Sequence, residues 1–468
     1  MGRLVGTQGA PLLNTVIAAA MIAGAATGAQ AETLRSAVAK AIETNPELGA
    51  VRHNRLAIDQ ELRAARGLYL PTVDVFGDLG RQKRRAKTPL LTNNYPWHNR
   101  RELALIVGQR LFDGFEARYE VERQSSRVTS AKWRVADTAN AIALRAIQAY
   151  LEIERARAVL AAAQRNVSAL NGLAARVNRR VSAGQGNRAE RSEAGSRAAN
   201  GRALVAEARA RLQDAIALYR SVVGSKPGHL HGAPHAKHVP GSLHAAIATA
   251  RTSAPSILAT DADRLASEAA IGTARSRYYP KLNAEVTTSY ARNTQQPNDA
   301  DKDTRAMLVA RWNLYNGGID TARVREARER ASEAAEIAAN TQRIVLRETR
   351  TSWNALQAAR ARVPQLQRQL SLARQTRRAY IEQYDAGVRR LLDLLDAQSE
   401  VFVADAALQT ERLVGKFSGY RVLASTGRLI ASLGLDMPWE AEADPVHWRS
   451  DFWGYDLHRH SDETAPLK

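Results

Sequence analysis

The sequence contains one set of marker residues twice, and this duplication limits the possible folds more than any other feature. The markers and their partners are Asn45-Pro46 with Ala254-Pro255, Tyr69-Leu70-Pro71 with Tyr278-Tyr279-Pro280, Leu111-Phe112-Asp113-Gly114 with Leu314-Tyr315-Asn316-Gly317, and Ala183-Gly184 with Ala386-Gly387. The first two pairs lie 209 residues apart and the last two lie 203 apart, so a net gap of 6 residues separates the second marker from the third. This spacing is far longer than a solenoid repeat and predicts a duplicated half-protein.

The N-terminus resembles an export signal. Arg3 supplies a positive start, residues 12–26 are mostly apolar, and Ala29-Gln30-Ala31 is a small-x-small cleavage site. We therefore expect residues 1–31 to be a signal peptide and the mature chain to begin at Glu32. A transmembrane anchor is the alternative, but the apolar run is short and interrupted by threonine and glycine.

The composition of the chain excludes several kinds of site, membrane anchor and partner. The 468 residues include no cysteine, which excludes disulfides, lipid attachment through cysteine and cysteine-based metal sites. After residue 31 no run of about 18 apolar residues remains for a membrane-spanning helix. The formal charge of +20 would suit a nucleic-acid partner. The export signal and the scattering of arginines along helical stretches favour solvated helix faces instead, so we expect no nucleic-acid partner.

Long helices are predicted in both halves. No proline occurs for 130 residues after Pro96, and residues 115–181 are rich in strong helix formers with apolar residues at helical spacing. One helix of this length would measure roughly 100 Å at about 1.5 Å per residue. Further helices are expected at 188–223, 319–384 and 391–433. Pro364 predicts a kink or break in the third of these four helices.

Two amphipathic hairpins are predicted at about 72–112 and 281–315. Apolar and polar residues alternate there, as in a membrane strand with lipid on one side and water on the other. The strands are about 9–11 residues long, enough to span a bilayer when tilted. An ordinary soluble sheet is the alternative, but two hairpins offer little sheet for helices of such length. The residues expected to face lipid are Val73, Val75, Leu103, Leu105, Val107, Leu282, Leu308 and Trp312.

Four strands cannot close a barrel, because single-chain barrels begin at about eight strands. Unpaired backbone groups in lipid cost several kcal/mol each, so open sheet edges are excluded there. The membrane interpretation therefore requires several copies of the chain, joined by a heterologous interface that closes into a ring.

The organisation that follows is a signal peptide (1–31), a first repeat (32–223), a linker (224–242), a second repeat (243–437) and a flexible C-terminal tail (438–468). Four histidines lie within the linker: His229, His231, His235 and His238. They could bind a metal, but a polar connector explains their composition as well, and we predict neither a metal site nor a cofactor.

From residue 32 to about 437 the chain resembles the TolC family of outer-membrane export channels, which includes efflux and type I secretion proteins. The resemblance rests on the duplicated markers and, most specifically, on the run Tyr-Asp-Ala-Gly-Val-Arg-Arg-Leu-Leu-Asp-Leu-Leu-Asp-Ala-Gln at 384–398. It implies a mainly α-helical fold with membrane β-strands, in which a homotrimer forms a 12-stranded barrel in outer-membrane lipid of a Gram-negative cell. A long helical barrel then extends into the periplasm.

The resemblance also implies partners and a cargo. These are a periplasmic adaptor (membrane fusion protein) and an inner-membrane transporter of the ABC or RND type. The sequence of residues 384–398 is more similar to members that serve type I protein secretion, so we expect a protein cargo. Drug efflux is the alternative. An enzyme such as a glycosidase is disfavoured because no globular core accompanies the paired carboxylates. A structural coiled-coil surface protein would explain the helices but not the hairpins.

The same resemblance assigns roles to the turns between the long helices. Gly184 and Gly387 would form the periplasmic tips that contact the adaptor. The carboxylate pairs just after them, Glu190 with Glu193 and Asp393 with Asp396, are expected to line the entrance as acidic rings. The resemblance implies this for both members of the Asp pair, whereas in the Glu pair only Glu190 matches a family position. Negative charge in the first turn of a helix is also favoured by the helix dipole, which is the structural alternative for these residues.

Tyr384 and Arg389 match positions that hold the entrance of family members closed. The resemblance implies that both bond toward Glu190 as a latch. A solvated surface arginine is the alternative for Arg389, and the neighbouring Gln185-Gly186-Asn187 and Arg390 depart from the better-known members.

Overall fold

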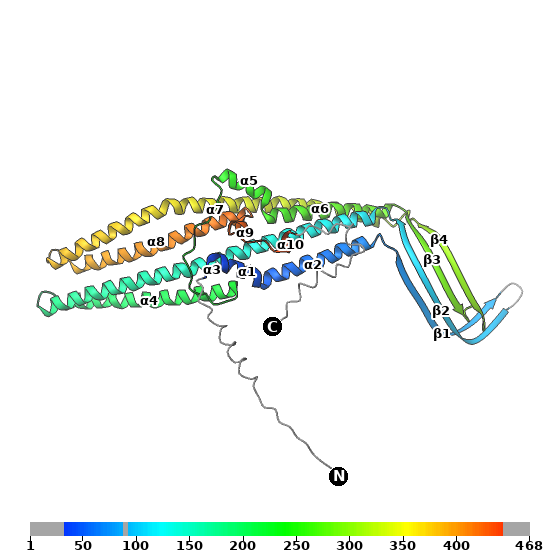
Figure 1. Cartoon of the computed structure of the whole chain (residues 1–468), viewed down its shortest axis with the longest axis horizontal. Coiled ribbons are helices and arrows are strands. Elements are labelled where there is room, and N and C mark those ends of the chain that lie inside the picture. The colour runs from blue at the N-terminus through cyan, green and yellow to red at the C-terminus, as the bar shows by residue number, and fades with distance from the viewer. Residues whose placement is uncertain (1–31, 88–91, 443–468) are drawn as a thin grey trace, which may run out of the picture.

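The computed structural model describes residues 32–87 and 92–442, and the molecule is long and narrow, with helices at one end and a sheet at the other (Figure 1). The helices are α1 (Leu34–Thr44), α2 (Pro46–Gly67), α3 (Glu116–Ser182), α4 (Arg188–Val223), α5 (Leu243–Ser253), α6 (Pro255–Arg275), α7 (Ile319–Asp385), α8 (Leu391–Ser425), α9 (Leu429–Ser432) and α10 (Trp439–Glu442), with a 3-10 turn η1 at Ser276–Tyr278. The strands are β1 (Thr72–Lys87), β2 (Thr92–Phe112), β3 (Lys281–Arg292) and β4 (Ala300–Arg311). The expected signal peptide lies outside the described residues.

The first marker of each repeat is a helix boundary. Asn45 ends α1, and its side chain accepts a hydrogen bond from the Glu47 amide to cap α2, whose first residue is Pro46. Proline suits this position because its fixed φ is helical and its missing N–H would have had no partner in the helix. Ala254 and Pro255 divide α5 from α6 in the same way but without a side-chain cap.

Two helix expectations differ from the structure. α7 runs unbroken through Pro364. A proline removes one backbone bond of a helix that has many others, and Figure 1 shows α7 curving gently over its length. The helix expected to reach about Leu433 ends at Ser425, because Gly427 takes a left-handed conformation (φ +72°) that turns the chain before the short α9.

The four strands form one antiparallel sheet in the order β1-β2-β3-β4. Directly opposite residues share a face of the sheet, and the register runs Val75 to Leu105 to Thr288 and onward to Thr304. Seven of the eight residues expected to face lipid lie on this single face: Val73, Val75, Leu103, Leu105, Val107, Leu282 and Leu308. We call it the apolar face.

Trp312, the eighth residue, is not in a strand. β4 ends at Arg311, and the Trp312 indole nitrogen donates a hydrogen bond to the backbone oxygen of Tyr278, 3.1 Å away. This bond holds the ring, which is 59% exposed, over the η1 turn at the junction with the helices.

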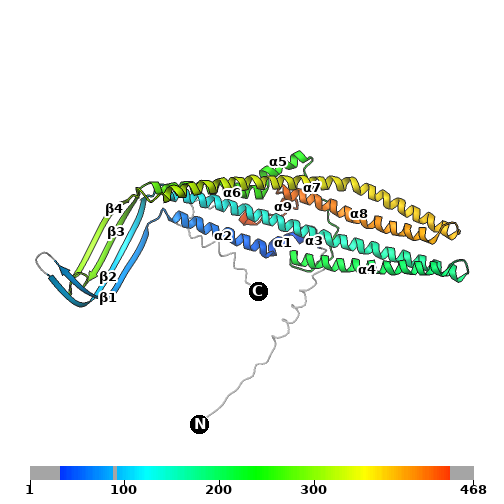
Figure 2. The ribbon, with the colours of Figure 1, turned by 180° about the vertical axis from the view of Figure 1, so that it is seen from behind.

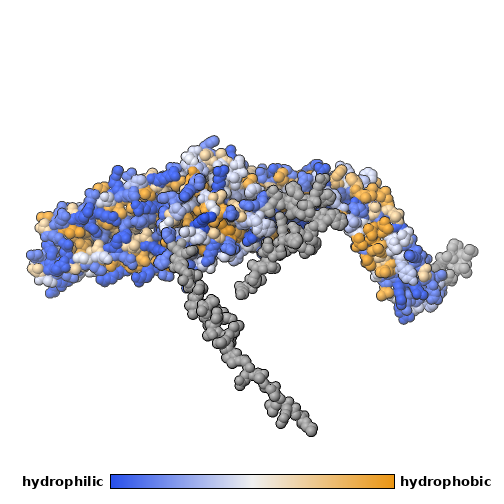
Figure 3. Space-filling view, in the orientation of Figure 1, coloured by the Kyte–Doolittle hydropathy of each residue, from blue (hydrophilic) through white to orange (hydrophobic). Residues whose placement is uncertain are grey.

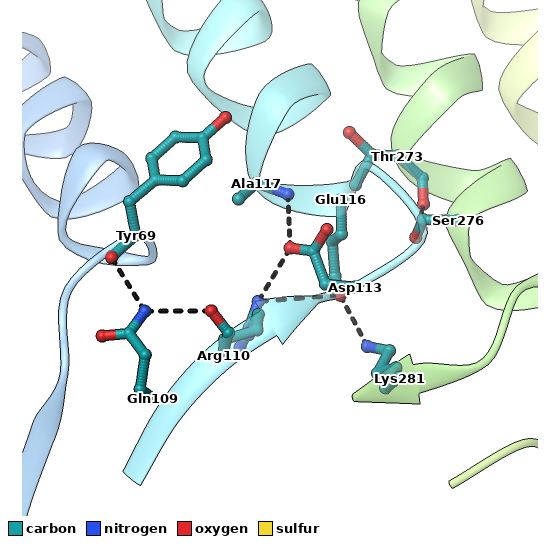
Figure 4. A network of polar contacts seen from close by, with 9 residues as sticks. All are labelled: Tyr69, Gln109, Arg110, Asp113, Glu116, Ala117, Thr273, Ser276 and Lys281. Atoms are coloured by element: carbon teal, nitrogen blue, oxygen red, sulfur yellow. Dashed lines mark hydrogen bonds and ion pairs between the residues drawn. The ribbon is translucent and has the colours of Figure 1, made fainter. Parts of the chain in front are cut away.

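The first Asp-Gly marker builds the junction between β2 and α3, shown in Figure 4. Asp113 accepts a 2.8 Å hydrogen bond from the Ala117 amide and so caps the helix, while Arg110 approaches the same carboxylate at 3.3 Å. Lys281 of β3 pairs with Glu116 at 2.6 Å and so joins the second hairpin to the start of α3. Gly114 has φ +71°, and a Cβ there would lie 2.5 Å from the Ser276 backbone oxygen, so no other residue fits without movement.

The main core surrounds the middle of α3, which lies between α2, α4, α6 and α8 in both ribbon views (Figures 1 and 2). Tyr150 is fully buried there, and its single hydroxyl hydrogen is shared between the backbone oxygens of Glu32 and His231, which lie 2.9 and 2.6 Å away. Burial, and then the charges of Glu154 and Glu32, raise the pKa of Tyr150 to about 12. The linker between the repeats is thus packed against the core rather than looped out.

The first residues of the expected tail are also packed. α10 contacts α3 and α2, and the buried Glu440 carboxylate pairs with Arg52 at 2.6 Å. The flexible tail expected from residue 438 therefore cannot begin there, and residues 443–468 lie outside the described part. Within residues 32–87 and 92–442, no helix is both long and apolar enough to cross a bilayer, and no cluster of three potential metal-ligating side chains forms.

Candidate functional site at the helix tips

The tip turns are two helix ends of the same geometry. In the first, the Gln185 amide donates to the Arg180 oxygen (2.9 Å), with Gly184 at φ +78°. In the second, the Val388 amide donates to the Gln383 oxygen (3.0 Å), with Gly387 at φ +80°. This bond pattern with a left-handed glycine satisfies carbonyls that the helix leaves unpaired. No atom lies within 4 Å of a Cβ built on either glycine, so both turns face open space.

The first carboxylate pair is partly structural. The Glu190 amide donates to the Asn187 side-chain oxygen (2.8 Å) and the Asn187 amide approaches the Glu190 carboxylate (3.4 Å), which is a capping box for α4. Glu193 lies one turn later and pairs with Arg197 at 3.2 Å.

The second pair is neutralised by arginines. Asp393 lies 3.7 Å from the Arg389 guanidinium and 3.4 Å from that of Arg390. Asp396 is 60% exposed and lies 3.3 Å from Arg197, the same arginine that pairs with Glu193. Arg197 of α4 therefore joins the two carboxylate pairs across the two helical hairpins, which are α3 with α4 and α7 with α8. It also places a positive charge among groups expected to form a purely acidic ring.

The two expected latch residues do not reach Glu190 within the chain. Arg389 stacks over the ring of Tyr380 at 4.1 Å and donates to the Gln383 side chain at 3.0 Å, so it is held by its own hairpin. Tyr384 is 3% exposed and its hydroxyl has no hydrogen-bond partner among the described residues. Burial first, and then the negative charge of Glu190, raise the pKa of this tyrosine, so Glu190 acts on Tyr384 at longer range and without a hydrogen bond.

Two arginines that the sequence analysis overlooked connect the hairpins here. Arg180 of α3 donates to the Tyr384 backbone oxygen, and its guanidinium lies over the Tyr384 ring, 4.6 Å from the ring centre. Arg176, one turn earlier, pairs with Asp385. Their spacing of four residues at the end of a helix is the only local signal for them, because the partners lie about two hundred residues away.

An apolar cluster lies beneath these contacts and belongs to both hairpins. Its members are Leu170, Leu173, Val177, Ala194, Ala198, Tyr384, Leu391, Leu394 and Leu395. Further from the tip, the Gln398 amide donates to Asn166 of α3 at 2.8 Å and accepts from Arg377 of α7 at 2.9 Å. The tips are therefore joined by polar contacts at the rim and by apolar packing beneath.

Asp405 is a deeper polar link. It accepts a 2.8 Å hydrogen bond from Arg165 of α3 and lies 3.8 Å from Arg374 of α7. Burial alone would raise the pKa of Asp405, but hydrogen bonds from Arg165 and Gln409 and the nearby positive charges outweigh it and lower the pKa.

Comparison with known proteins agrees with this architecture. The family model for "Outer membrane efflux protein" matches residues 37–224 and 246–413. The outer membrane efflux protein BepC of Brucella suis is 27% identical over 427 residues, covering 90% of this chain and 92% of its own.

Solved channels share the fold at lower identity. The outer membrane protein VceC of Vibrio cholerae superposes with a TM-score of 0.73 at 17% identity, covering 86% of this chain and 97% of that one. The CmeC channel of Campylobacter jejuni gives 0.75 at 15% identity, covering 86% and 90%. The expected resemblance and fold class are confirmed. The chain therefore belongs to the outer membrane efflux protein family, and it is an outer-membrane export channel with a periplasmic helical part, not an enzyme.

Proposed function

We propose that three copies of the chain close a 12-stranded barrel and form the exit duct of a tripartite export system. The observation that carries this proposal is the open sheet: β1 and β4 are both edges, beside a face whose apolar side chains are exposed. Val75 is 70% exposed and Leu308 is 64% exposed. In lipid the exposure is favourable, but the unpaired edges are not, so β1 of one copy pairs with β4 of the next.

The absence of cysteine gives a clean test of this ring. Val75→Cys in β1 combined with a scan of cysteines along β4, from Thr304 to Leu308, should produce covalent trimers after oxidation. Each single variant is the control and should stay monomeric in denaturing gels. Double variants that never form covalent dimers or trimers would contradict the ring.

The open turns at Gly184 and Gly387 are the surface for a periplasmic adaptor in this proposal. Their exposure at the far end of the molecule from the strands supports it (Figure 1). Beyond the adaptor lies an inner-membrane transporter of the ABC or RND type.

The cargo in this proposal is protein exported by a type I system, on the strength of the 384–398 run. Small-molecule efflux is the alternative, since BepC carries the name of an efflux protein. A deletion strain of the source organism separates the two. Complementation should restore export of a protein with a C-terminal secretion signal, whereas restored drug resistance without secretion would favour efflux.

The entrance is closed by contacts between the two hairpins, with Tyr384 and Arg389 as the latch and Glu190, Glu193, Asp393 and Asp396 lining the mouth. Arg180 supports this role through its contacts with Tyr384. Arg389→Ser and Arg180→Ala should each raise single-channel conductance in planar bilayers. The first variant loosens the tip of the second hairpin, where Arg389 contacts Tyr380 and Gln383, and the second removes the contact of Arg180 with Tyr384 across the hairpins.

Two further variants test the latch and the acidic mouth separately. Tyr384→Phe removes only a hydroxyl without a partner and should leave conductance unchanged. Asp393→Ala with Asp396→Ala should reduce cation selectivity, measured as the reversal potential in a salt gradient. Parent conductance in both arginine variants would rule out the latch, and an unchanged reversal potential would rule out the acidic mouth.

A further inference from the structure

The sheet separates its charges by face. Every acidic residue of the described strands lies on the face opposite the apolar face: Asp74, Asp78, Glu102, Glu285, Asp301 and Asp303. The charged residues of the apolar face are all basic, and all of them lie toward the end of the sheet that is far from the helices.

These basic residues form a belt across the four strands. Arg81 of β1, Arg101 of β2, Arg292 of β3 and Lys302 of β4 follow the apolar residues on the same face, and Lys83 and Arg85 continue the alternation along β1. All six side chains are exposed. Figure 3 shows hydrophobic residues over the strands next to the helices and hydrophilic residues beyond them.

The belt has no counter-charge within the described chain. On the opposite face Arg100 pairs with Asp78 at 3.0 Å and also with Glu102, and Arg305 lies 3.8 Å from Asp303. By contrast, none of the six belt residues forms an ion pair with a described residue. Arg101 and Arg292 are direct register partners on neighbouring strands, an arrangement of like charges that is unfavourable unless an anion lies near both.

The position of the belt indicates which anion this is. On β3 the apolar face runs from Leu282 to Tyr290, about 26 Å along the strand at about 3.3 Å per residue. At the usual tilt of barrel strands this covers roughly 20 Å of the apolar height of about 25 Å that outer-membrane barrels have. Arg292 follows directly. Tyr290 is 50% exposed at this level, and such aromatic residues favour the boundary between lipid and water. Since the helices are periplasmic, the belt lies at the outer leaflet.

We infer that this belt binds the phosphate groups of anionic glycolipids in the outer leaflet, of the lipopolysaccharide type. Guanidinium groups bind phosphate oxygens in pairs of parallel hydrogen bonds, which suits the adjacent Arg101 and Arg292. Basic clusters next to an apolar membrane surface are typical of anionic headgroup recognition. The inference rests on the proposed closed barrel, which turns the apolar face outward.

The test compares two variants that remove equal charge from opposite faces. The belt variant is Arg101→Gln with Arg292→Gln, and the control is Arg305→Gln with Arg311→Gln. Purified, delipidated trimers are incubated with lipopolysaccharide, with its enzymatically dephosphorylated form, or with phosphatidylcholine, and retained lipid is quantified. The belt variant should retain at least about fivefold less lipopolysaccharide than the parent and the control. The dephosphorylated lipid should bind all three equally weakly.

Several outcomes would overturn the inference. The inference fails if the belt variant retains as much lipopolysaccharide as the parent, or if the control variant loses as much as the belt variant. It also fails if millimolar inorganic phosphate alone displaces the lipid. If the belt variant is unstable, Arg81→Gln with Lys302→Gln replaces it with the same expectation. Trimer formation and conductance are measured on the same samples, so a protein that forms no conducting trimer counts against the proposed duct and not only against the lipid site.

Discussion

Helices α3 and α7 have equal lengths of 67 residues and equivalent places in the duplicated sequence, but they differ in surroundings. α3 buries side chains along nearly all of its length and packs against helices of both repeats. α7 packs mainly against α6 and α8 and leaves Ile337, Ile344 and Leu372 about half exposed. The first helix completes the core of one copy, whereas the second retains an apolar surface that a neighbouring copy can cover.

The side chains at matching positions explain the difference. Ile147, fully buried in α3, corresponds under the 203-residue shift to the exposed Arg350 of α7. The two halves thus share the same helices, but the side chains of the long helix are deeply buried only in the first half. Four pairs of variants test this comparison.

Ile147→Ala should have the largest effect. Removing a buried isoleucine from a packed core costs about 2–5 kcal/mol because the cavity collapses only partly. Arg350→Ala at the matching position of α7 should change the free energy of unfolding by no more than about 0.5 kcal/mol. Thermal melting of the helical signal by circular dichroism compares the two, and equal shifts would show that the halves are packed alike.

Gly114→Ala should come next. Both Gly114 and Gly317 have positive φ, which costs alanine about 1–2 kcal/mol, but only Gly114 is crowded by the Ser276 oxygen. The first variant should therefore lose more than about 2 kcal/mol and the matched Gly317→Ala variant about 1 kcal/mol. The same melting experiment measures the loss of stability of each variant, and the ratio of the two losses is the quantity to compare. A ratio near one would mean that close approach plays no part.

Asp113→Ala should cost about 1 kcal/mol, a typical value for a lost helix cap. Asn316 is its counterpart before α7, and within residues 32–87 and 92–442 its side chain forms no hydrogen bond equivalent to that of Asp113 with Ala117. Asn316→Ala should accordingly be close to neutral. Urea unfolding of the two variants in detergent measures the difference, and a larger loss for the asparagine variant would reverse the interpretation of the two junctions.

The pH dependence of Asp405 should be the smallest effect, because its partner Arg165 is more than half exposed and solvent screens the pair. The lowered pKa of Asp405 means that the carboxylate stabilises the folded state above the unfolded pKa of about 3.9. This contribution is lost as pH falls through the lower folded value. Asp405→Asn should therefore melt earlier at pH 7 and approach the parent below about pH 4.

Glu207→Gln on α4 is the control for that experiment, since Glu207 is about half exposed and its one ion pair with a described residue is with Arg211 of its own helix. It should follow the parent at every pH. A constant difference between Asp405→Asn and the parent from pH 3 to 7 would show that the aspartate contributes by packing rather than by charge.

The tips separate what could be predicted from what could not. Gly184 and Gly387 were predictable because a left-handed glycine between two helical stretches is a local feature. The role of Arg197, which joins Glu193 to Asp396, was not, because it depends on the contact of α4 with α8. Among the described residues, neither Tyr384 nor Arg389 contacts Glu190. Arg389 instead bonds Gln383 and stacks on Tyr380, and the Tyr384 ring is covered by Arg180 while its hydroxyl stays without a hydrogen-bond partner there.

By itself the sequence determined the duplication, which a comparison of its two halves reveals. It also determined the long helices, the amphipathic strands and the turns, since each of these depends on residues close together in the chain. Only the tertiary structure decided that α3 rather than α7 occupies the core, which arginine neutralises which carboxylate, and that the unpaired basic residues gather on one end of the apolar face. These features depend on which helices and strands meet and in what register. A pattern of alternation or helical spacing is the same whatever partner lies opposite, so it carries no information on that choice.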